Sequence, residues 1–319
     1  MKKYDVIALG ELLIDFTENG ISENGNPLLE ENPGGAPCNV LAMLQNLGKK
    51  TAFIGKVGKD AFGKYLAETV QALGIDITGL VQDGEIPTTL AFVHTAADGD
   101  RSFSFYRNPG ADMMLTKDEI DYSRIDEAGI FHFGTLSMTH EGVREATKQA
   151  VSRAKEKGLL ISFDPNYRPL LWKDPETAKE MMHYGFSVCD ILKISDDEIT
   201  FVTGKETIEE AITEFCKLYQ PKLMSVTCGK NGSIVIYKDM QVKCEAHIRP
   251  DTIETTGAGD TFMACMLDYV LEQGLEDLCE EDLLQLQKFA GIAASLITTR
   301  RGALKVMPTK EEIAAEQQK

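Results

Sequence analysis

The chain has 319 residues, a formal net charge of −17, and 43% apolar and 26% charged residues. This length and apolar content are enough for a large buried core, such as that of an α/β fold built around one sheet. The acidic charge, without any run of Lys and Arg, argues against a face that binds nucleic acid. No stretch of 18 apolar residues occurs, so the sequence predicts no contact with a membrane interior.

The N-terminal third alternates between apolar runs and helical spacing. Residues 6–9 are apolar and end at Gly10, which predicts a buried strand at the start of a cytoplasmic protein. Residues 20–34 are polar and contain two prolines, so they are predicted to be loop or peripheral strand. Helical spacing and apolar runs then predict a helix over 34–48, a strand over 51–57 and a helix over 62–73.

A hairpin is predicted where residues 88–95 and 101–107 flank Asp98-Gly99-Asp100. Polar and apolar residues alternate in the second run, which is typical of a strand with one solvated face. The sequence also contains GKDAFGK at 58–64, which is close to a phosphate-binding loop. Tyr65 replaces the hydroxyl residue that such a loop needs, so this stretch is predicted to be an ordinary strand, turn and helix.

From residue 129 onward, short apolar runs alternate with helical patterns, which predicts a mainly parallel sheet covered by helices on both faces. The predicted strands are 129–133, 159–163, 190–194, 222–227 and 233–237, and the predicted helices are 141–157, 175–188, 196–203, 207–219, 258–273 and 282–298, followed by a frayed helix over 310–319. Ligands of such sheets bind beyond the carboxyl ends of the strands. The residues at those ends are therefore the candidates for a site.

The sequence ETTGAGD at 254–260 precedes the predicted helix 258–273. Glycines at a helix N-terminus expose backbone N–H groups, which form a site for phosphate oxygens. Asp260 is placed where its carboxylate could take a proton from an attacking hydroxyl, and phosphoryl transfer needs both features. By itself the motif fits an ordinary glycine-rich helix start equally well.

Three other segments carry candidate ligands, each with a simpler structural alternative. Gly34 and Gly35 allow close backbone approach and Asn39 suits a sugar hydroxyl, but the three also fit an ordinary turn and helix start. Asp164, Asn166 and Arg168 alternate after a predicted strand, and Arg168 could bridge phosphate oxygens; a polar loop is the alternative. Glu198 could orient a water bound to Mg²⁺, although Ser195 to Glu198 also reads as a helix capping box.

In this order, the segments resemble the signatures of the PfkB carbohydrate kinases, also called the ribokinase family. The resemblance runs from about residue 6 to residue 308, with GGAPCNV at 34–40 and TTGAGDTF at 255–262 about 220 residues apart. GGAP at 34–37, SFSFYRNPGADMML at 102–115 and FDPNYRPLLW at 163–172 are most similar to the fructokinase branch. The resemblance implies one ribokinase-like α/β domain over 1–319, with three α/β/α layers, a mainly parallel central sheet and a small β-sheet lid from about 11–33 and 86–110.

The resemblance also implies roles for individual residues. The catalytic group would comprise Asp260 as general base, Gly257, Ala258 and Gly259 as the anion hole, and Arg168 beside the transferring phosphate. The sugar would be held by Asp15, Gly34, Gly35, Asn39, Asp164 and Asn166, with Phe103 and Arg107 closing over it from the lid. ATP would lie against Lys193, Thr227, Gly229, Gly232, Gly257 and Gly259, and Glu198 would organise Mg²⁺ through water.

The implied reaction transfers the γ-phosphoryl group of ATP to the 6-hydroxyl of D-fructose, in an enzyme that dimerises through its lid. A 2-keto-3-deoxygluconate kinase is an alternative, because Tyr106, Arg107 and Arg168 would suit an acidic sugar. An inactive sugar sensor is an alternative from another class. The resemblance also implies a K⁺ site at Glu254 and Thr256 near residues 301–303. Because Glu254 stands where relatives commonly have Asp, the sequence leaves dependence on K⁺ open.

Overall fold

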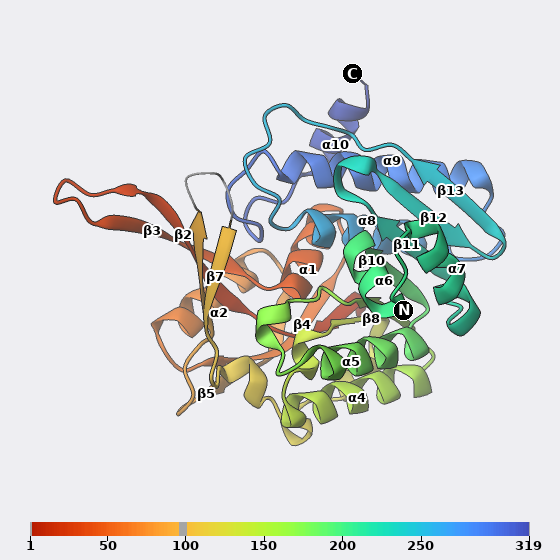
Figure 1. The fold of residues 1–319 in the computed structure, drawn as a ribbon. Helices are drawn as coiled ribbons and strands as arrows, with labels where there is room; N and C mark the ends of the chain where they lie inside the picture. The colour runs from red at the N-terminus through yellow and green to blue at the C-terminus, as the bar shows by residue number, and fades with distance from the viewer. Residues whose placement is uncertain (1, 96–100, 319) are drawn as a thin grey trace.

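The computed structural model describes residues 2–95 and 101–318, with the backbone alone at 94, 95 and 101–103. A sheet of nine strands forms its centre (Figure 1). From one edge to the other the order is β13 (Met240–Cys244), β12 (Ser233–Tyr237), β11 (Leu223–Thr227), β10 (Ile191–Ser195), β9 (Leu160–Asp164), β8 (Ala128–Gly134), β1 (Tyr4–Leu9), β4 (Thr51–Gly58) and β5 (Asp76–Asp83). The strands from β11 to β5 run parallel, whereas β12 and β13 add an antiparallel edge.

Both faces of this sheet are buried, as the alternation along β1 shows. Val6 and Ala8 belong to one hydrophobic core, and Ile7 and Leu9 belong to another on the opposite face. The first core is covered by α1 (Ala36–Asn46), α2 (Ala61–Ala72), α8 (Ala258–Gln273) and α9 (Glu280–Ile297), and the second by α4 (Glu141–Glu156), α5 (Pro175–Val188), α6 (Asp196–Thr203) and α7 (Ile208–Leu218). The predicted three-layer fold is confirmed.

A smaller sheet of four strands stands apart from the large one (Figure 1). Its order is β3 (Pro27–Gly34), β2 (Leu13–Ile21), β6 (Leu90–Thr95) and β7 (Arg101–Tyr106), and only the β2–β6 pair is parallel. Phe16 stacks on Phe92 with ring centroids 5.0 Å apart, which ties the two halves of the sheet together. These strands fall within the two segments expected to form a lid; the predicted turn at Asp98-Gly99-Asp100 lies outside the described residues.

Several predictions of elements need correction. β5 and β13 were not predicted, because both are edge strands with few buried side chains, and an apolar pattern is therefore weak there. Residues 310–319 were predicted to be frayed, yet α10 (Lys310–Gln317) has a capping box at Thr309, and Ile313 is fully buried. The stretch at 58–64 is confirmed as a strand, turn and helix, since Asp60 caps α2 through Gly63.

No helix in the described part of the chain is both long and apolar enough to cross a membrane.

Candidate active site

Asp260 lies in the first turn of α8, where the chain leaves a tight turn. Gly257 precedes this helix with φ 78°, and a Cβ added there would approach the Ala303 side chain to 2.9 Å. Both the backbone angle and the close packing favour glycine. The N–H groups of a first helical turn have no partner within the helix, so those after Gly257 can bind an anion, although the N–H of Ala258 also donates to the carbonyl of Thr255 at 3.2 Å.

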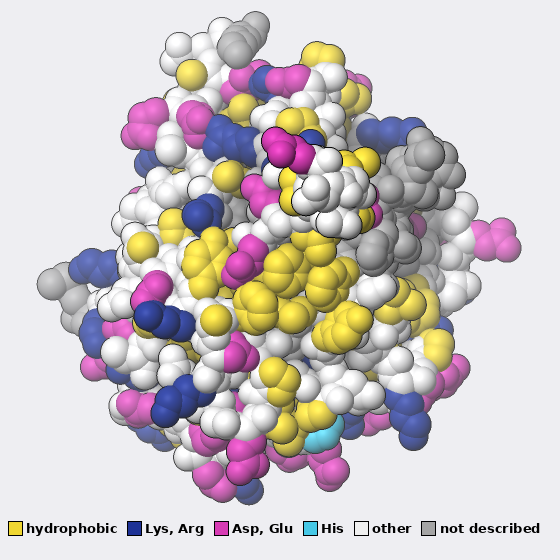
Figure 2. All heavy atoms as spheres, turned by 90° about the vertical axis from the view of Figure 1, so that its left-hand side faces the viewer, with side chains coloured by type: hydrophobic (Ala, Val, Ile, Leu, Met, Phe, Trp, Pro, Cys, Tyr) yellow, Lys and Arg dark blue, Asp and Glu magenta, His cyan; other side chains and the backbone are white. Residues whose placement is uncertain are grey.

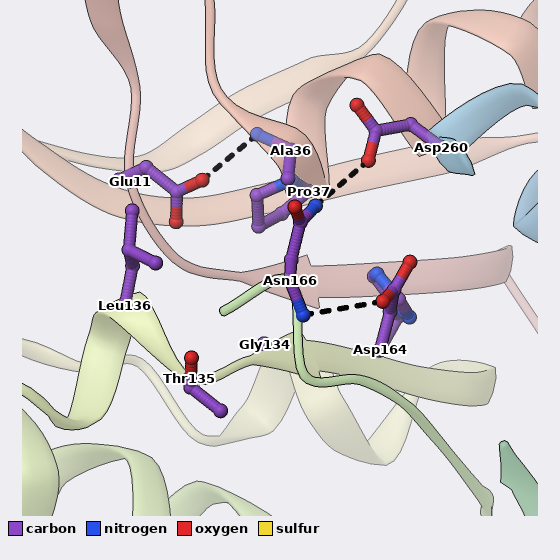
Figure 3. Close-up of a pocket in the computed structure, with 10 residues that line it drawn as sticks. Glu11, Ala36, Pro37, Gly134, Thr135, Leu136, Asp164, Asn166 and Asp260 are labelled. Carbon is purple, nitrogen blue, oxygen red and sulfur yellow. Dashed lines mark hydrogen bonds between the residues drawn. The ribbon is translucent and has the colours of Figure 1, made fainter. Parts of the chain in front are cut away.

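Two asparagines hold the carboxylate of Asp260. Nδ2 of Asn39 in α1 donates to Oδ2 at 2.8 Å, and Nδ2 of Asn166 donates to Oδ1 at 2.9 Å. Asn166 adopts φ 45°, a left-handed conformation that asparagine tolerates well, and its backbone N–H donates to Oδ1 of Asp164 at 3.2 Å. Two predicted candidates from distant parts of the sequence, Asn39 and Asn166, therefore converge at Asp260, and Figure 3 shows Asn166 between Asp260 and Asp164.

The environment of Asp260 suits a base that works near neutral pH. Asp260 is only 7% exposed to solvent. Burial and then the charge of Asp164 raise the pKa of Asp260 to about 6, although the Asn39 hydrogen bond and the charges of Lys193 and Arg168 act in the opposite direction. A carboxylate with this pKa accepts a proton more readily than an ordinary aspartate and is still ionised at pH 7.

A buried ion pair lies on the neighbouring strands. Nζ of Lys193 on β10 is 2.9 Å from Oδ2 of Asp164 on β9. Burial lowers the pKa of Lys193, but the charges of Asp164 and Glu198 outweigh it, so the pKa is raised and the side chain stays cationic. A Cβ added to Gly259 would lie 3.1 Å from this ammonium group. The positive charge of Lys193 therefore sits directly beside the helix start.

A small pocket opens beside Asp260 (Figure 3). Its lining consists of Glu11, Ala36, Pro37, His132, Gly134, Thr135, Leu136, Asp164, Asn166 and Asp260. Glu11 was not predicted as a site residue. It is buried, its Oε1 accepts the N–H of Ala36 at 2.8 Å, and burial raises its pKa to about 7. Its position after β1, at the carboxyl end of a parallel strand, is the signal that could have identified it.

The paired glycines bring β3 and α1 close to the start of β2. Gly35 has φ 132°, and a Cβ there would collide with the carbonyl oxygen of Glu11; a Cβ on Gly34 would collide with the carboxylate of Asp15. Burial raises the pKa of Asp15 to about 7, with Arg168 lowering it and the carboxylates of Glu254 and Asp260 raising it. These groups therefore share one electrostatic environment.

Asn39 also has an unsatisfied atom. Its Oδ1 is buried and has no hydrogen-bond partner among the described residues. A buried acceptor without a donor is costly, so it calls for a ligand or a water that supplies one. A sugar hydroxyl is a donor of this kind.

The predicted capping box at Ser195 is confirmed. Oγ of Ser195 accepts the N–H of Glu198 at 3.2 Å, and Oε2 of Glu198 accepts the N–H of Ser195 at 2.8 Å. Oε1 of Glu198 accepts the N–H of Tyr167 at 2.7 Å, so the same carboxylate also fixes the segment before Arg168. Arg168 itself is exposed, and its Nη1 donates to the carbonyl of Tyr167 at 3.2 Å.

Of the two side chains predicted to close over the sugar from the lid, the structure describes only one. The side chain of Phe103 lies outside the described part of the structure. Arg107 is buried, with Nε donating to Asp112 at 2.8 Å, Nη1 to Thr139 at 3.0 Å and Nη2 to the carbonyl of Leu136 at 3.0 Å. These contacts brace Arg107 against the segment 136–139, and its closure over a sugar stays a prediction.

A second, larger pocket of about 640 Å³ lies between α9 and the segment after β13, and it is large enough to admit a nucleoside. Its lining consists of Lys243, Cys244, Glu245, Ala246, His247, Leu284, Gln287, Lys288, Gly291, Ile292 and Gln317. Gly232 borders it, since a Cβ there would collide with the carbonyl oxygen of Cys244. Thr227 and Gly229 lie between the carboxyl end of β11 and Gly232, whereas Lys193 belongs with the first pocket.

A buried carboxylate and a cationic side chain at a helix start, in a structure that also has a nucleoside-sized pocket, are groups that phosphoryl transfer can use. Residues 3–310 match the pfkB family of carbohydrate kinases, and the chain belongs to this family.

Individual relatives agree with this assignment over nearly the whole chain. "Probable fructokinase-2" of Arabidopsis thaliana is 40% identical over 95% of this chain and 93% of its own length. A Xylella fastidiosa fructokinase with bound ATP is similar in structure, with a TM-score of 0.89, 29% identity, and coverage of 98% of this chain and 99% of that one. A Vibrio cholerae fructokinase double mutant, bound to fructose, ADP and potassium ion, has a TM-score of 0.87 and 27% identity, with 99% of each chain covered.

Proposed function

We propose that this carbohydrate kinase is a fructokinase, which transfers the γ-phosphoryl group of ATP to the 6-hydroxyl of D-fructose. The observation that carries the proposal is the carboxylate of Asp260, which Asn39 and Asn166 fix at the start of α8 and whose pKa is about 6. The fructokinase names of the relatives, and the fructose and ADP in the Vibrio cholerae protein, support this choice of substrates.

In the proposed reaction, Asp260 takes the proton of the 6-hydroxyl as that oxygen bonds to the γ-phosphorus. The bond between this phosphorus and the bridging oxygen of ADP breaks at the same time, and ADP leaves with the electron pair. The N–H groups after Gly257, from Ala258 through Gly259, together with the cations of Lys193 and Arg168, would stabilise the charge on the transferring group. Lys193 and the backbone N–H groups are held in place before the reaction and need little reorganisation, whereas the exposed Arg168 would have to turn towards the phosphate.

The sugar would bind beside Asp260, over the mouth of the small pocket, whose volume of about 10 Å³ holds only about one water. Asp15, Gly34, Gly35, Asn39, Asp164 and Asn166 are the proposed sugar-binding residues. Buried carboxylates and amides at this density match the many hydroxyl groups of a sugar, and the unsatisfied Oδ1 of Asn39 is a ready acceptor. The engaged guanidinium of Arg107 disfavours a 2-keto-3-deoxygluconate kinase, because that side chain is not available to bind a substrate carboxylate. An intact Asp260 disfavours an inactive sugar sensor.

The nucleoside of ATP would occupy the second pocket, with Thr227, Gly229 and Gly232 near its entrance and Lys193, Gly257 and Gly259 near the phosphates. Mg²⁺ would neutralise charge on the phosphates when bound. Glu198 fits a hydrated ion better than a bare one, because each of its oxygens already accepts one backbone N–H. The remaining lone pairs can accept hydrogen bonds from waters on Mg²⁺.

A monovalent cation site is proposed beside the anion turn. Oε1 of Glu254 accepts the N–H of Gly302 at 3.0 Å, which joins the segment 254–256 to the segment 301–303. Glu254 and the exposed Thr256 would contribute oxygen ligands there. The potassium ion in the Vibrio cholerae relative supports K⁺ as the occupant.

We also propose that the small sheet is a lid and that two copies of the protein meet through it. Hydrophobic side chains gather on the face of the molecule that carries this sheet (Figure 2). Leu29 and Tyr106, which the strand register places on the same face as Phe16, are 43% and 68% exposed. A second copy could bury such an apolar face.

The proposed location is the cytoplasm. All seven cysteines are free thiols in the structure, and this state is typical of a reducing compartment.

The direct test is an assay of the purified protein with ATP and fructose, with 2-keto-3-deoxygluconate as the competing acceptor. Asp260→Ala should lower kcat by ~10²–10⁴-fold, because it removes the base. Asp197→Ala, which removes an exposed carboxylate from α6, serves as the control and should keep normal turnover. A folded Asp260→Ala protein with near-normal kcat would refute the role of Asp260, and a higher kcat/KM for the acidic sugar would refute the choice of fructose.

A further inference from the structure

The C-terminal helix α10 is firmly docked on the body of the protein. Oγ1 of Thr309 accepts the N–H of Glu312 at 3.3 Å, and Oε2 of Glu312 accepts the N–H of Thr309 at 2.8 Å, so the helix start is fixed. Ile313 is fully buried in the same hydrophobic core as α9. The last residue of the helix, Gln317, reaches the lining of the nucleoside pocket.

Glu316 connects this helix to the segment that follows β13. Its side chain is 11% exposed, and Oε1 lies 2.9 Å from Nη1 of Arg249 and 3.3 Å from Nε2 of His247. Arg249 also binds Asp251 through two hydrogen bonds of 3.0 and 2.9 Å. A largely buried carboxylate that binds a guanidinium is a stronger tie than an exposed ion pair.

The segment held in this way runs from the nucleoside pocket to the turn that precedes α8. Residues 245–257 contain neither helix nor strand, and they connect β13 to the turn at Gly257. Their first part, through His247, lines the nucleoside pocket. Their last part is tied to the body separately, because the N–H groups of Ile253 and Glu254 donate to the carbonyl of Thr298 at 2.7 and 3.1 Å.

The contacts of Glu316 and the hydrogen bonds to the carbonyl of Thr298 therefore hold different ends of the segment. Without the hydrogen-bond ladder of a strand or helix, the position of its first part depends on the side chains that hold it. His247 is itself a pocket residue, and Arg249 follows two residues later. The contacts of Glu316 fall on this part, whereas the carbonyl of Thr298 binds next to the anion turn. The hydroxyl of Thr298 adds a weaker link between the two, since it contacts Thr252 at 3.1 Å and Thr252 donates to the carbonyl of Arg249 at 3.0 Å.

We propose that Glu316 is a positioning residue for the nucleotide: through Arg249 and His247 it holds residues 245–249 as one wall of the nucleoside pocket. The inference rests on the proposed function, since it requires the nucleoside of ATP to occupy this pocket. Glu316 does not contact the reacting atoms, and the small pocket beside Asp260 is lined by other elements. Its loss should therefore weaken ATP binding and leave both sugar binding and the chemical step unchanged.

The test compares Glu316→Gln with Glu311→Gln, which makes the same change at an exposed site on the same helix. Glu316→Gln should raise the KM for ATP, and the Kd for ATP measured by calorimetry, by about 3- to 10-fold. The KM for fructose and kcat should stay at wild-type values. Arg249→Gln should cause a similar rise, and the double variant should show little additional effect, because both changes break one interaction.

A folded Glu316→Gln protein with an unchanged Kd for ATP would overturn this inference while leaving the proposed function intact. Equal losses for ATP and fructose would also overturn it, because they would indicate a general loss of stability. If Glu316→Gln did not fold, the same comparison with Arg249→Gln would decide the matter. A wild-type protein that binds no ATP and phosphorylates no sugar would instead refute the proposed function, and this inference with it.

Discussion

At the scale of single residues, Asp260 as the proposed general base must meet two requirements. It must be ionised at neutral pH to accept a proton, yet it must hold that proton well enough to assist the attacking oxygen. Burial and Asp164 raise its pKa to about 6, and the hydrogen bond from Asn39 keeps the pKa from rising further. The asparagines therefore orient the base and also limit its proton affinity.

This balance predicts the pH dependence of the reaction. The ionised form of Asp260 is the proposed active one, so kcat/KM for fructose should be constant well above pH 7 and should fall at lower pH as the sugar ligand Asp15, with a pKa of about 7, and Asp260, with a pKa of about 6, take up protons. Asn39→Ala removes a hydrogen bond to the ionised form, so it should shift the midpoint of this fall to higher pH. The measurement is kcat/KM from pH 5 to pH 8 at constant ionic strength and saturating ATP. A midpoint that stays fixed or moves to lower pH in Asn39→Ala would contradict this account.

Sequence patterns could predict some of the site residues and not others, for a physical reason. Asp260, Asn39 and Asn166 stand in compact motifs at strand ends or helix starts, where local backbone geometry already aims a side chain. Arg107 stands in such a motif too, but its partners Thr139 and the carbonyl of Leu136 come from another part of the chain. Glu11 is similar, since only the tertiary fold brings Ala36 to its carboxylate. No local pattern contains these contacts.

At the scale of elements, end signals made the helices easier to predict than the edge strands. Asp174, Ser195 and Thr207 each cap a helix through a hydrogen bond to the backbone N–H three residues later, and all three helices were predicted. β13 has one buried residue, Val242, so the pattern that identifies a buried strand is missing. An edge strand forms because it pairs with the neighbouring strand, and this pairing leaves no local pattern in the sequence.

The segments 254–256 and 301–303 carry a prediction at this scale, because a bound cation would join two pieces of chain. If K⁺ occupies the proposed site, the rate should be at least about fivefold higher in KCl than in choline chloride at equal ionic strength, through tighter ordering of the anion turn. Glu254→Ala should abolish this difference, while Glu254→Asp should keep it because a carboxylate remains. Equal rates in the two salts for the wild-type protein would refute the cation site.

At the scale of the whole molecule, the two sheets have different roles. The large sheet brings the carboxyl ends of β9 and β10 to the start of α8, so that Asp164, Lys193 and Asp260 meet in a rigid frame. The small sheet joins this frame beside the proposed sugar site, where β2 and β3 carry Asp15 and Gly34. A lid in this position could shield the sugar from water, which would otherwise compete as the phosphoryl acceptor.

The apolar face of the small sheet predicts the assembly of the molecule. Light scattering coupled to size-exclusion chromatography should give twice the mass of one chain for the wild-type protein. Leu29→Asp on β3 should shift the protein towards monomer, because it places a charge in the proposed interface. Leu218→Asp on α7, where the leucine is 62% exposed, makes the same change outside the sheet and should leave the dimer intact. A wild-type monomer at all concentrations, or equal effects of the two variants, would show that the small sheet is not the interface and that its apolar side chains serve the lid alone.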